Sequence, residues 1–427
     1  MKRRDFLTTT ALGSIALGLD AQTTTTKQDG HGRESMQEAA PTGKAPAQPV
    51  MVSSANGFNG MDKGYQMLLD GGDTLDAAIA VGQTQEDDAN DMSVGLGGLP
   101  DEDGRTTLDS CCMHGPTRRA GSVGCISWTK NAARLGHAVM THTGHVMLVG
   151  TYADTFAKDM GFPNDLVLTE RARQVWMLWK EYHSGADWWG PSLSDPEYTP
   201  PAKSANEINI YDVQLRRLRD AAADLGIPEQ FRTQAILAVL VPPHGTIHVS
   251  ALKPNGEMSG MTTTSGLAWK IAGRVGDSAV IGAGSYTDQD VGSAGATGSG
   301  EENIRIMGAH TIVENMRHGM SPRDAGIDAL KRIVRNYKND MNKLQYVSMT
   351  FYVLRKDGEY AGVSLWSGAP EHPTQFCVHD GKGKRLEDCT SLVKGVGSEF
   401  PPTPKALEDA MRRLRGQRQQ RGQQSPR

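Results

Sequence analysis

The chain reads His244-Gly245-Thr246-Ile247 near its middle and continues through Met261-Thr262-Thr263-Thr264-Ser265-Gly266, Gly273-Arg274-Val275-Gly276-Asp277-Ser278 and Ala296-Thr297-Gly298. These four pieces supply a Gly–Thr junction, a second threonine hydroxyl, a cation and an anion three residues apart, and a hydroxyl–glycine pair. Together, such groups suffice to bind a zwitterionic amino acid and to attack an amide on its side chain.

The Gly245–Thr246 junction suits a threonine that becomes a nucleophile after backbone cleavage. A threonine hydroxyl attacks poorly unless a base takes its proton, and the α-amine of the same residue is an available base. That amine is free only when the bond before Thr246 is cut, and its unperturbed pKa of about 8 leaves a useful fraction neutral. Glycine tolerates the strained backbone that brings the threonine hydroxyl to the preceding carbonyl. We therefore predict self-cleavage by an N-to-O acyl shift and hydrolysis of the resulting ester.

Each signal taken alone also has an ordinary structural explanation. Gly–Thr pairs are common, and Arg274 with Asp277 fits a surface ion pair. The alternation in Thr262–Thr264 fits a half-buried strand. Thr297-Gly298 would be a loop in most proteins. Only the combination favours a functional site.

The stretch Thr246–Arg305 resembles the β-subunit of the glycosylasparaginases, which are N-terminal nucleophile hydrolases. The matching segments are Thr-Ile at 246, Thr-Thr-Ser-Gly at 263, Gly-Arg-Val-Gly-Asp-Ser at 273, Ile-Gly-Ala-Gly at 281 and Ala-Thr-Gly at 296. Upstream, the segments Ser93–Gly98, Asp103–Arg105, Leu108-Asp109 and Gly144–Gly150 look like the family's α-subunit. The resemblance covers residues 49–182 and 241–400, and its motifs are highly specific in combination.

The resemblance implies a catalytic role for four residues. Thr246 would be the nucleophile, and Thr264 would hydrogen-bond its amine or hydroxyl and so tune it. The Thr297 hydroxyl and the Gly298 N–H would form the oxyanion hole, which typically contributes about 3–4 kcal/mol per donor.

Two further residues would bind the substrate. Arg274 would clamp its α-carboxylate with two parallel donors, and Asp277 would accept from its α-ammonium group. Three positions depart from the family pattern: Gly245, where aspartate is usual but plant-type asparaginases have glycine; His248, where glycine is usual; and Ala55, where a substrate-contacting tryptophan is common. His248 would be either a neutral packed imidazole or a residue that touches the site.

The hydrophobic pattern predicts an α+β fold, because strands grouped apart from helices favour packed sheets with helices outside. Strands are predicted at Val50–Ser54, Thr106–Met113, Ser122–Trp128, Val146–Val149, Ile247–Leu252, Met258–Thr264, Tyr346–Arg355, Tyr360–Trp366 and Gln375–Val378. Helices are predicted at Lys63–Leu69, Thr74–Thr84, Asn131–Thr141, Ala153–Met160, Glu170–Tyr182, Ile208–Ala223, Glu301–Arg317 and Ser321–Asn336. Asn255-Gly256 predicts a hairpin between the strands that flank it. The four-layer αββα sandwich is what the resemblance implies.

The resemblance also divides the catalytic domain into an α-subunit, residues 49–245, and a β-subunit, residues 246–400. Residues 183–243 match the family poorly. We expect a loose segment just before the cleavage point, because the new chain end must move aside to open the pocket. The pair Trp188-Trp189 would either replace the aromatic surface lost at Ala55 or pack elsewhere.

Residues 1–21 have the pattern of a twin-arginine signal peptide, with Arg3-Arg4 before Phe6-Leu7 and a mildly apolar stretch. A plain secretory signal or a basic tail is the alternative. Residues 22–48 form a predicted disordered linker, and residues 401–427 a basic, glutamine-rich tail. We therefore expect an exported protein, periplasmic or extracellular, without a permanent membrane span.

The charge and cysteine content exclude several other classes. With a net charge of −4, the chain does not have the excess of basic residues that is typical of nucleic-acid-binding proteins. The five cysteines show no Cys-x-x-Cys spacing and the histidines no ligand spacing, so we expect neither a metal nor another cofactor. Cys377–Cys389 is the favoured disulfide, and at least one of Cys111-Cys112 is expected to be a buried free thiol.

The sequence thus predicts an exported amidohydrolase that releases L-aspartate from the GlcNAc–asparagine linkage. One alternative is a plant-type asparaginase or isoaspartyl peptidase. Another is an uncleaved, non-catalytic relative that binds its partner. The resemblance further implies a dimer of cleaved αβ heterodimers.

Overall fold

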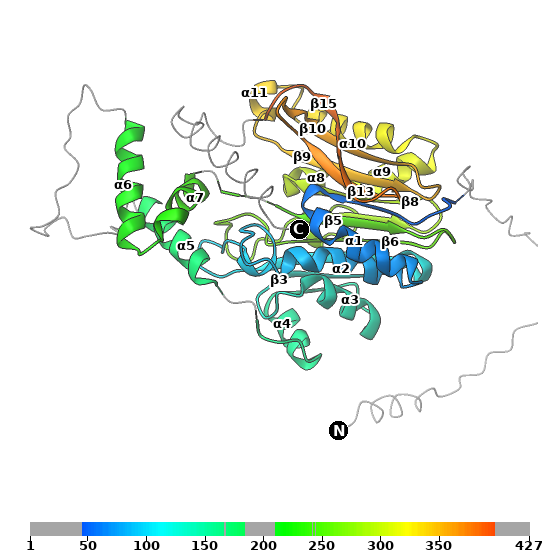
Figure 1. Cartoon of the computed structure of the whole chain (residues 1–427), viewed down its shortest axis with the longest axis horizontal. Helices are drawn as coiled ribbons and strands as arrows, with labels where there is room; N and C mark the ends of the chain where they lie inside the picture. The colour runs from blue at the N-terminus through cyan, green and yellow to red at the C-terminus, as the bar shows by residue number, and fades with distance from the viewer. Residues whose placement is uncertain (1–44, 166–167, 184–209, 241, 244, 398–427) are drawn as a thin grey trace, which may run out of the picture. The chain divides into compact units, whose positions relative to one another are not determined.

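The computed structural model describes residues 45–165, 168–183, 210–240, 242–243 and 245–397 (Figure 1). The predicted signal peptide, most of the predicted linker and the predicted C-terminal tail therefore lie outside the described residues, as does Trp188-Trp189.

Two β-sheets form the centre of the fold (Figure 1). The larger has the strand order β14-β13-β1-β5-β6-β2-β3-β4, and the smaller has the order β15-β10-β9-β8-β7. The strands of the larger sheet are β1 Val50–Ser54, β2 Leu108–His114, β3 Arg119–Ile126, β4 Met147–Val149, β5 Ile247–Leu252, β6 Met258–Thr264, β13 Gln375–His379 and β14 Arg385–Asp388. Those of the smaller are β7 Ser285–Asp288, β8 Gly292–Gly298, β9 Met349–Arg355, β10 Tyr360–Trp366 and β15 Thr390–Val393, and a two-stranded ribbon is formed by β11 Gly368–Ala369 and β12 His372–Pro373.

Helices cover the outer face of each sheet (Figure 1). The helices are α1 Phe58–Leu69, α2 Thr74–Glu86, α3 Ala132–His142, α4 Gly150–Asp159, α5 Glu170–His183, α6 Ile210–Asp224, α7 Glu229–Leu240, α8 Gly300–Ile306, α9 Gly308–Arg317, α10 Pro322–Asn336 and α11 Met341–Leu344. Helices α1, α2 and α3 pack on the larger sheet, and α9 and α10 on the smaller. The predicted α+β, four-layer αββα sandwich of the N-terminal nucleophile hydrolase type is confirmed.

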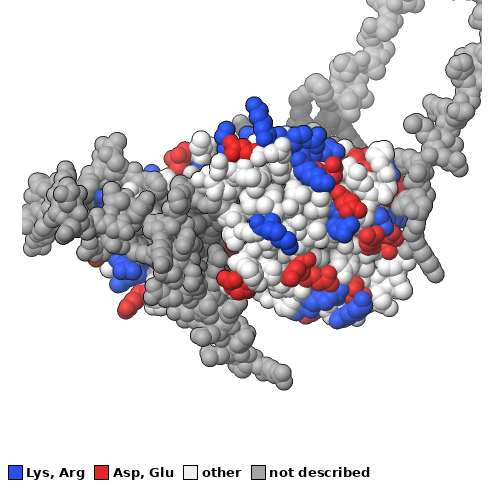
Figure 2. Space-filling model, turned by 90° about the horizontal axis from the view of Figure 1, so that it is seen from above, with Lys and Arg blue, Asp and Glu red and all other residues white. Residues whose placement is uncertain are grey.

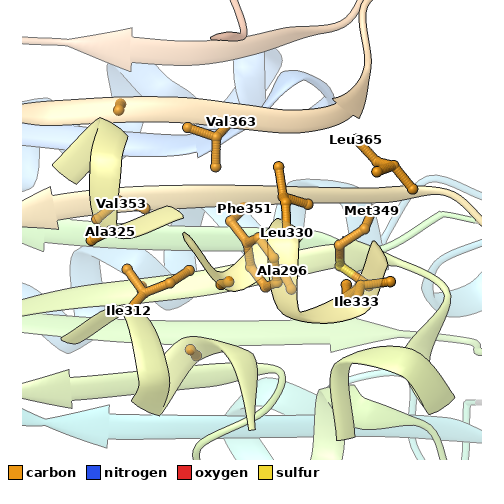
Figure 3. Close-up of a cluster of buried hydrophobic side chains, with 14 of the residues drawn as sticks. Ala296, Ile312, Ala325, Leu330, Ile333, Met349, Phe351, Val353, Val363 and Leu365 are labelled. Atoms are coloured by element: carbon orange, nitrogen blue, oxygen red, sulfur yellow. The ribbon is translucent and has the colours of Figure 1, made fainter. Parts of the chain in front are cut away.

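Both faces of each sheet are buried, which explains why the central strands consist mainly of apolar and small residues. Between the smaller sheet and its helices, Phe351 is fully buried against Ile312 of α9 and Leu330 of α10 (Figure 3). Between the two sheets, Val52 of the larger meets Leu354 of the smaller in a separate apolar cluster. Packing on both faces therefore fixes the position of each sheet and of the strand ends that carry the candidate site.

The hairpin of β5 and β6 has the predicted bounds, and its register pairs Ile247 with Thr263. Other parts of the secondary structure differ from the prediction. The single predicted helix Glu301–Arg317 is two helices, because Met307 adopts a left-handed backbone with φ of 47°. Strand β8 was not predicted, since its sequence Gly-Ser-Ala-Gly-Ala-Thr-Gly contains no large strand-forming residue.

Helices α5, α6 and α7 share a cluster of buried side chains that includes Leu178, Ala222 and Val239. Trp179 of α5 stacks on Trp269, with ring centroids 5.0 Å apart. Helix α7 was not predicted, and it lies in the stretch expected to be loose. Its residues 229–240 are instead packed.

The predicted Cys377–Cys389 disulfide is wrong, because both cysteines are free thiols. Cys377 lies opposite Leu386 in the β13–β14 pair and packs beneath α1, whereas Cys389 bonds to Thr374 through its backbone and packs between the sheets. Leu386, the partner of Cys377, lies three residues before Cys389. Because side chains alternate between the two faces of a sheet, this odd spacing places Cys377 and Cys389 on opposite faces. Cys111 and Cys112 are both buried and free, which confirms that expectation.

In the described residues, no helix is both long and apolar enough to span a membrane.

Positive and negative side chains are interspersed on the face shown in Figure 2.

Candidate active site

A cavity of about 300 Å³ opens where β5, β6 and β8 come together. It is lined by Ser54, Ala55, Asn56, Gly245, Thr246, Thr264, Gly266, Leu267, Asp277, Thr297, Gly298, Ser348 and Tyr352. Six of the seven residues predicted for the site therefore share one cavity. The seventh, Arg274, does not form part of the wall.

The hydroxyls of Thr246 and Thr264 form a directed chain to the Gly245 carbonyl. Thr246 Oγ1 donates to Thr264 Oγ1 at 3.2 Å, and Thr264 Oγ1 donates to the Gly245 carbonyl oxygen at 2.6 Å. The Gly266 N–H donates to Thr264 Oγ1 at 3.0 Å. Thr264 is the last residue of β6 and Thr246 immediately precedes β5, so the antiparallel pairing of these strands brings the two hydroxyls together.

The carbonyl of Thr246 is held from the other side by residues at the end of β1. Asn56 Nδ2 donates to this oxygen at 3.2 Å, and Ser54 Oγ approaches it at 3.5 Å. Ser54 also donates to Asn56 Oδ1 at 2.6 Å. Neither residue was predicted for the site, although Ala55 between them marks the position where a tryptophan is common in the family. The signal was the neighbouring pair of polar side chains at the end of an apolar strand.

Asp277 is buried, and its carboxylate accepts from Asn303 Nδ2 at 2.7 Å. Burial raises the pKa of Asp277 to about 6, while Asn303 and Arg274 oppose the rise and the Asp109 carboxylate adds to it. The Asp277 carboxylate and the Arg274 guanidinium both lie next to Gly300. A Cβ on this glycine would lie 2.7 Å from Asp277 Oδ1 and 3.3 Å from Arg274 Nη2.

Arg274 binds a carboxylate of the protein itself. Its Nε and Nη2 atoms donate to Glu301 Oε1 at 3.0 and 2.8 Å. The Arg274 side chain is 17% exposed and that of Glu301 is 51% exposed. The guanidinium thus binds one carboxylate oxygen through two donors, and Glu301 is the more exposed partner of the pair.

Thr297 and Gly298 end strand β8 instead of forming a loop. The backbone of Gly298 has a φ of 128°, which residues other than glycine rarely adopt. A Cβ at this position would overlap the Ser348 carbonyl oxygen. Thr297 Oγ1 lies 2.8 Å from Tyr352 Oη. Tyr352 was not predicted, and no local motif marks it.

Of the two explanations for His248, the packed imidazole is confirmed. The side chain is fully buried, with Nδ1 2.8 Å from Thr262 Oγ1 and Nε2 2.8 Å from Ser250 Oγ. Burial lowers the pKa of His248 to about 3, so the ring is neutral at physiological pH. His248 does not line the cavity. Among the described residues, no three His, Cys, Asp or Glu side chains gather as ligands for a metal ion.

Residues 43–344 match the model of the family described as Asparaginase. An N(4)-(β-N-acetylglucosaminyl)-L-asparaginase of Elizabethkingia miricola is 34% identical over 386 residues, which cover 90% of this chain and 94% of that protein. The mouse protein of the same name is 33% identical over 296 residues, or 68% of this chain and 79% of its own length. A probable isoaspartyl peptidase/L-asparaginase 3 of Arabidopsis thaliana is 29% identical over 74% of this chain and 84% of its own.

Proposed function

Because the chain belongs to the asparaginase family, as an amidohydrolase of the glycosylasparaginase type, we propose that Thr246 is its nucleophile and is released by scission of the Gly245–Thr246 bond. The observation that carries this proposal is the hydroxyl chain from Thr246 through Thr264 to the Gly245 carbonyl. It links the attacking group, a proton acceptor and the carbonyl to be attacked.

The proposed scission begins with attack of Thr246 Oγ1 on the Gly245 carbonyl carbon. The Thr246 hydroxyl proton passes to Thr264, whose own proton moves toward the Gly245 oxygen as negative charge develops there. When the C–N bond breaks, the proton relayed through Thr264 is transferred to the nitrogen. This step frees the α-amine of Thr246 and leaves an ester between Gly245 and the Thr246 side chain. Water then hydrolyses the ester, which releases the Gly245 carboxylate and regenerates the Thr246 hydroxyl.

In turnover, the freed amine takes the hydroxyl proton of Thr246 as the oxygen attacks the side-chain amide of the substrate. Thr297 Oγ1 and the Gly298 N–H stabilise the negative carbonyl oxygen. The leaving amine accepts a proton, and an aspartyl ester remains on Thr246. Water activated by the same amine releases L-aspartate.

The proposed substrate is the GlcNAc–asparagine linkage, with free α-amino and α-carboxyl groups on the asparagine. Two relatives named for this activity support it, one of them over nearly its full length. Asparagine or a β-aspartyl peptide is the second candidate, favoured by Gly245 and by the Arabidopsis relative. Aspartate release from GlcNAc-asparagine, asparagine and β-aspartyl dipeptides, compared as kcat/KM, tests the choice. A higher value for either of the last two would overturn the first proposal.

We expect substrate binding to weaken as the pH falls through about 6, because only ionised Asp277 accepts from an ammonium group. Asn303→Ala removes a donor that stabilises the carboxylate, so the pKa of Asp277 rises and the loss of binding moves to higher pH. The inhibition constant of L-aspartate, measured against pH, reports this separately from the titration of the Thr246 amine.

Asn315→Ala is the matched control, because Asn315 donates to Ala325 and Asp328 away from the cavity. An unchanged pH profile in Asn303→Ala would remove Asp277 from ammonium recognition.

We also propose export through the twin-arginine signal and assembly as a dimer of αβ heterodimers. The support for export is the pair Arg3-Arg4 before Phe6-Leu7. A twin-lysine variant that still reaches the periplasm would contradict export by this route, and light scattering of the mature protein tests the assembly.

A further inference from the structure

Tyr352 is a buried tyrosine whose side chain lines the cavity beside Thr297. It is 4% exposed, and its hydroxyl oxygen lies 2.8 Å from Thr297 Oγ1. The hydrogen-bonded hydroxyls of Tyr352 and Thr297 therefore lie near the end of strand β8, which is at Gly298.

The register of β8 and β9 explains this pair of hydroxyls. Thr297 pairs with Thr350, and Gly295 pairs with Tyr352. Paired residues and residues two apart share one face of a sheet, so all four point into the space between the two sheets. The backbone of Tyr352 lies opposite Gly295, and its side chain extends diagonally across to β8, where the hydroxyl meets that of Thr297.

His248 of the facing sheet holds the tyrosine ring in place. A Cβ on Gly295 would overlap the His248 imidazole, so the glycine leaves room for that ring. The rings of His248 and Tyr352 are nearly parallel, at 10° with centroids 6.2 Å apart. His248 is itself fixed by hydrogen bonds to Thr262 and Ser250, so the tyrosine lies against a rigid surface.

We propose that Tyr352 is a positioning residue that donates its hydroxyl hydrogen to Thr297, so that the Thr297 hydroxyl hydrogen is directed at the oxyanion of the reaction. The inference rests on the proposed role of Thr297. A threonine hydroxyl has one hydrogen and two acceptor positions. If that hydrogen were donated to Tyr352, none would remain for the substrate.

The chemistry of the two hydroxyls favours this direction. A phenol is a stronger acid than an aliphatic alcohol and is therefore the better donor. Burial raises the pKa of Tyr352, so the phenol keeps its proton. A hydrogen bond from the phenol would also polarise the Thr297 hydroxyl, because hydrogen bonds in series strengthen one another. Tyr352 would thus both orient Thr297 and strengthen it as a donor.

The test is a double-mutant cycle of Tyr352→Phe and Thr297→Ala, assayed by aspartate release from GlcNAc-asparagine. Tyr352→Phe keeps the ring and removes the donor. We expect kcat to fall roughly tenfold with KM little changed, compared with about a hundredfold or more for loss of a direct oxyanion donor such as Thr297. In the Thr297→Ala background, Tyr352→Phe should have no further effect, because there is no hydroxyl left to position.

Tyr360→Phe is the control, since the Tyr360 hydroxyl bonds to Glu387 and Arg385 and does not line the cavity. Its kcat should match that of the parent enzyme. Melting temperature and the two-chain pattern on a denaturing gel identify any variant that fails to fold.

The outcomes separate this inference from the function on which it rests. Full activity of Tyr352→Phe, or equal losses from this change with and without Thr297, would overturn the positioning role alone. Full activity of Thr297→Ala would instead remove Thr297 from the oxyanion hole, and the role of Tyr352 with it.

Discussion

Replacement of Thr246 by alanine is expected to leave one uncut chain with a loss of turnover on the order of 10⁴-fold or more. The same oxygen is proposed to attack the Gly245 carbonyl and, later, the substrate. Alanine removes that oxygen, and without scission it also prevents release of the α-amine that serves as the base. A single substitution thus removes nucleophile and base together.

Thr246→Ser is the matched control, because serine retains the hydroxyl and the capacity to yield a free α-amine. We expect this variant to be cut and to turn over substrate at a reduced rate. A denaturing gel and an aspartate-release assay measure both effects. Two chains or substantial turnover in Thr246→Ala would contradict the proposed role of this residue.

Replacement of Arg274 by alanine is expected to lower kcat/KM by about 10²–10³ while leaving self-cleavage unchanged. The guanidinium is proposed to bind the substrate carboxylate, and the scission of Gly245–Thr246 involves no such group. Arg274 also lies outside the cavity wall that surrounds the scissile bond. Steady-state kinetics measure the loss of kcat/KM, and the two-chain pattern on a denaturing gel measures self-cleavage. The substitution should change the first and leave the second unchanged.

Glu301→Gln gives the opposite change at the same site. Glu301 occupies two donors of Arg274, so a neutral amide should compete less with the substrate carboxylate. Because a partly exposed ion pair is worth about 0.2–1 kcal/mol, KM should fall by roughly 1.4- to fivefold. If KM were unchanged in both variants, Arg274 would have no part in substrate binding.

The fold was predictable where local patterns decide it. The alternating residues around Asn255-Gly256 gave the hairpin of β5 and β6 with its observed bounds. That hairpin also explains why Thr246 and Thr264 meet, since the pairing of Ile247 with Thr263 places them side by side.

What could not be predicted depends on contacts between elements distant in sequence. In strand β8, Gly295 has no room for a side chain because the facing ring of His248 occupies that space. The position of Tyr352 and the separation of Cys377 from Cys389 follow from strand register and sheet packing. The pairing of Arg274 with Glu301 joins a loop to helix α8. No short motif contains that information.

The sequence of the new N-terminus tests the central claim most directly. Purified enzyme that releases aspartate should contain a smaller chain that begins Thr246-Ile247-His248, because the threonine must carry a free α-amine to act as its own base. An active preparation that consists only of the uncut chain, or of a smaller chain with a different first residue, would show that another group is the nucleophile.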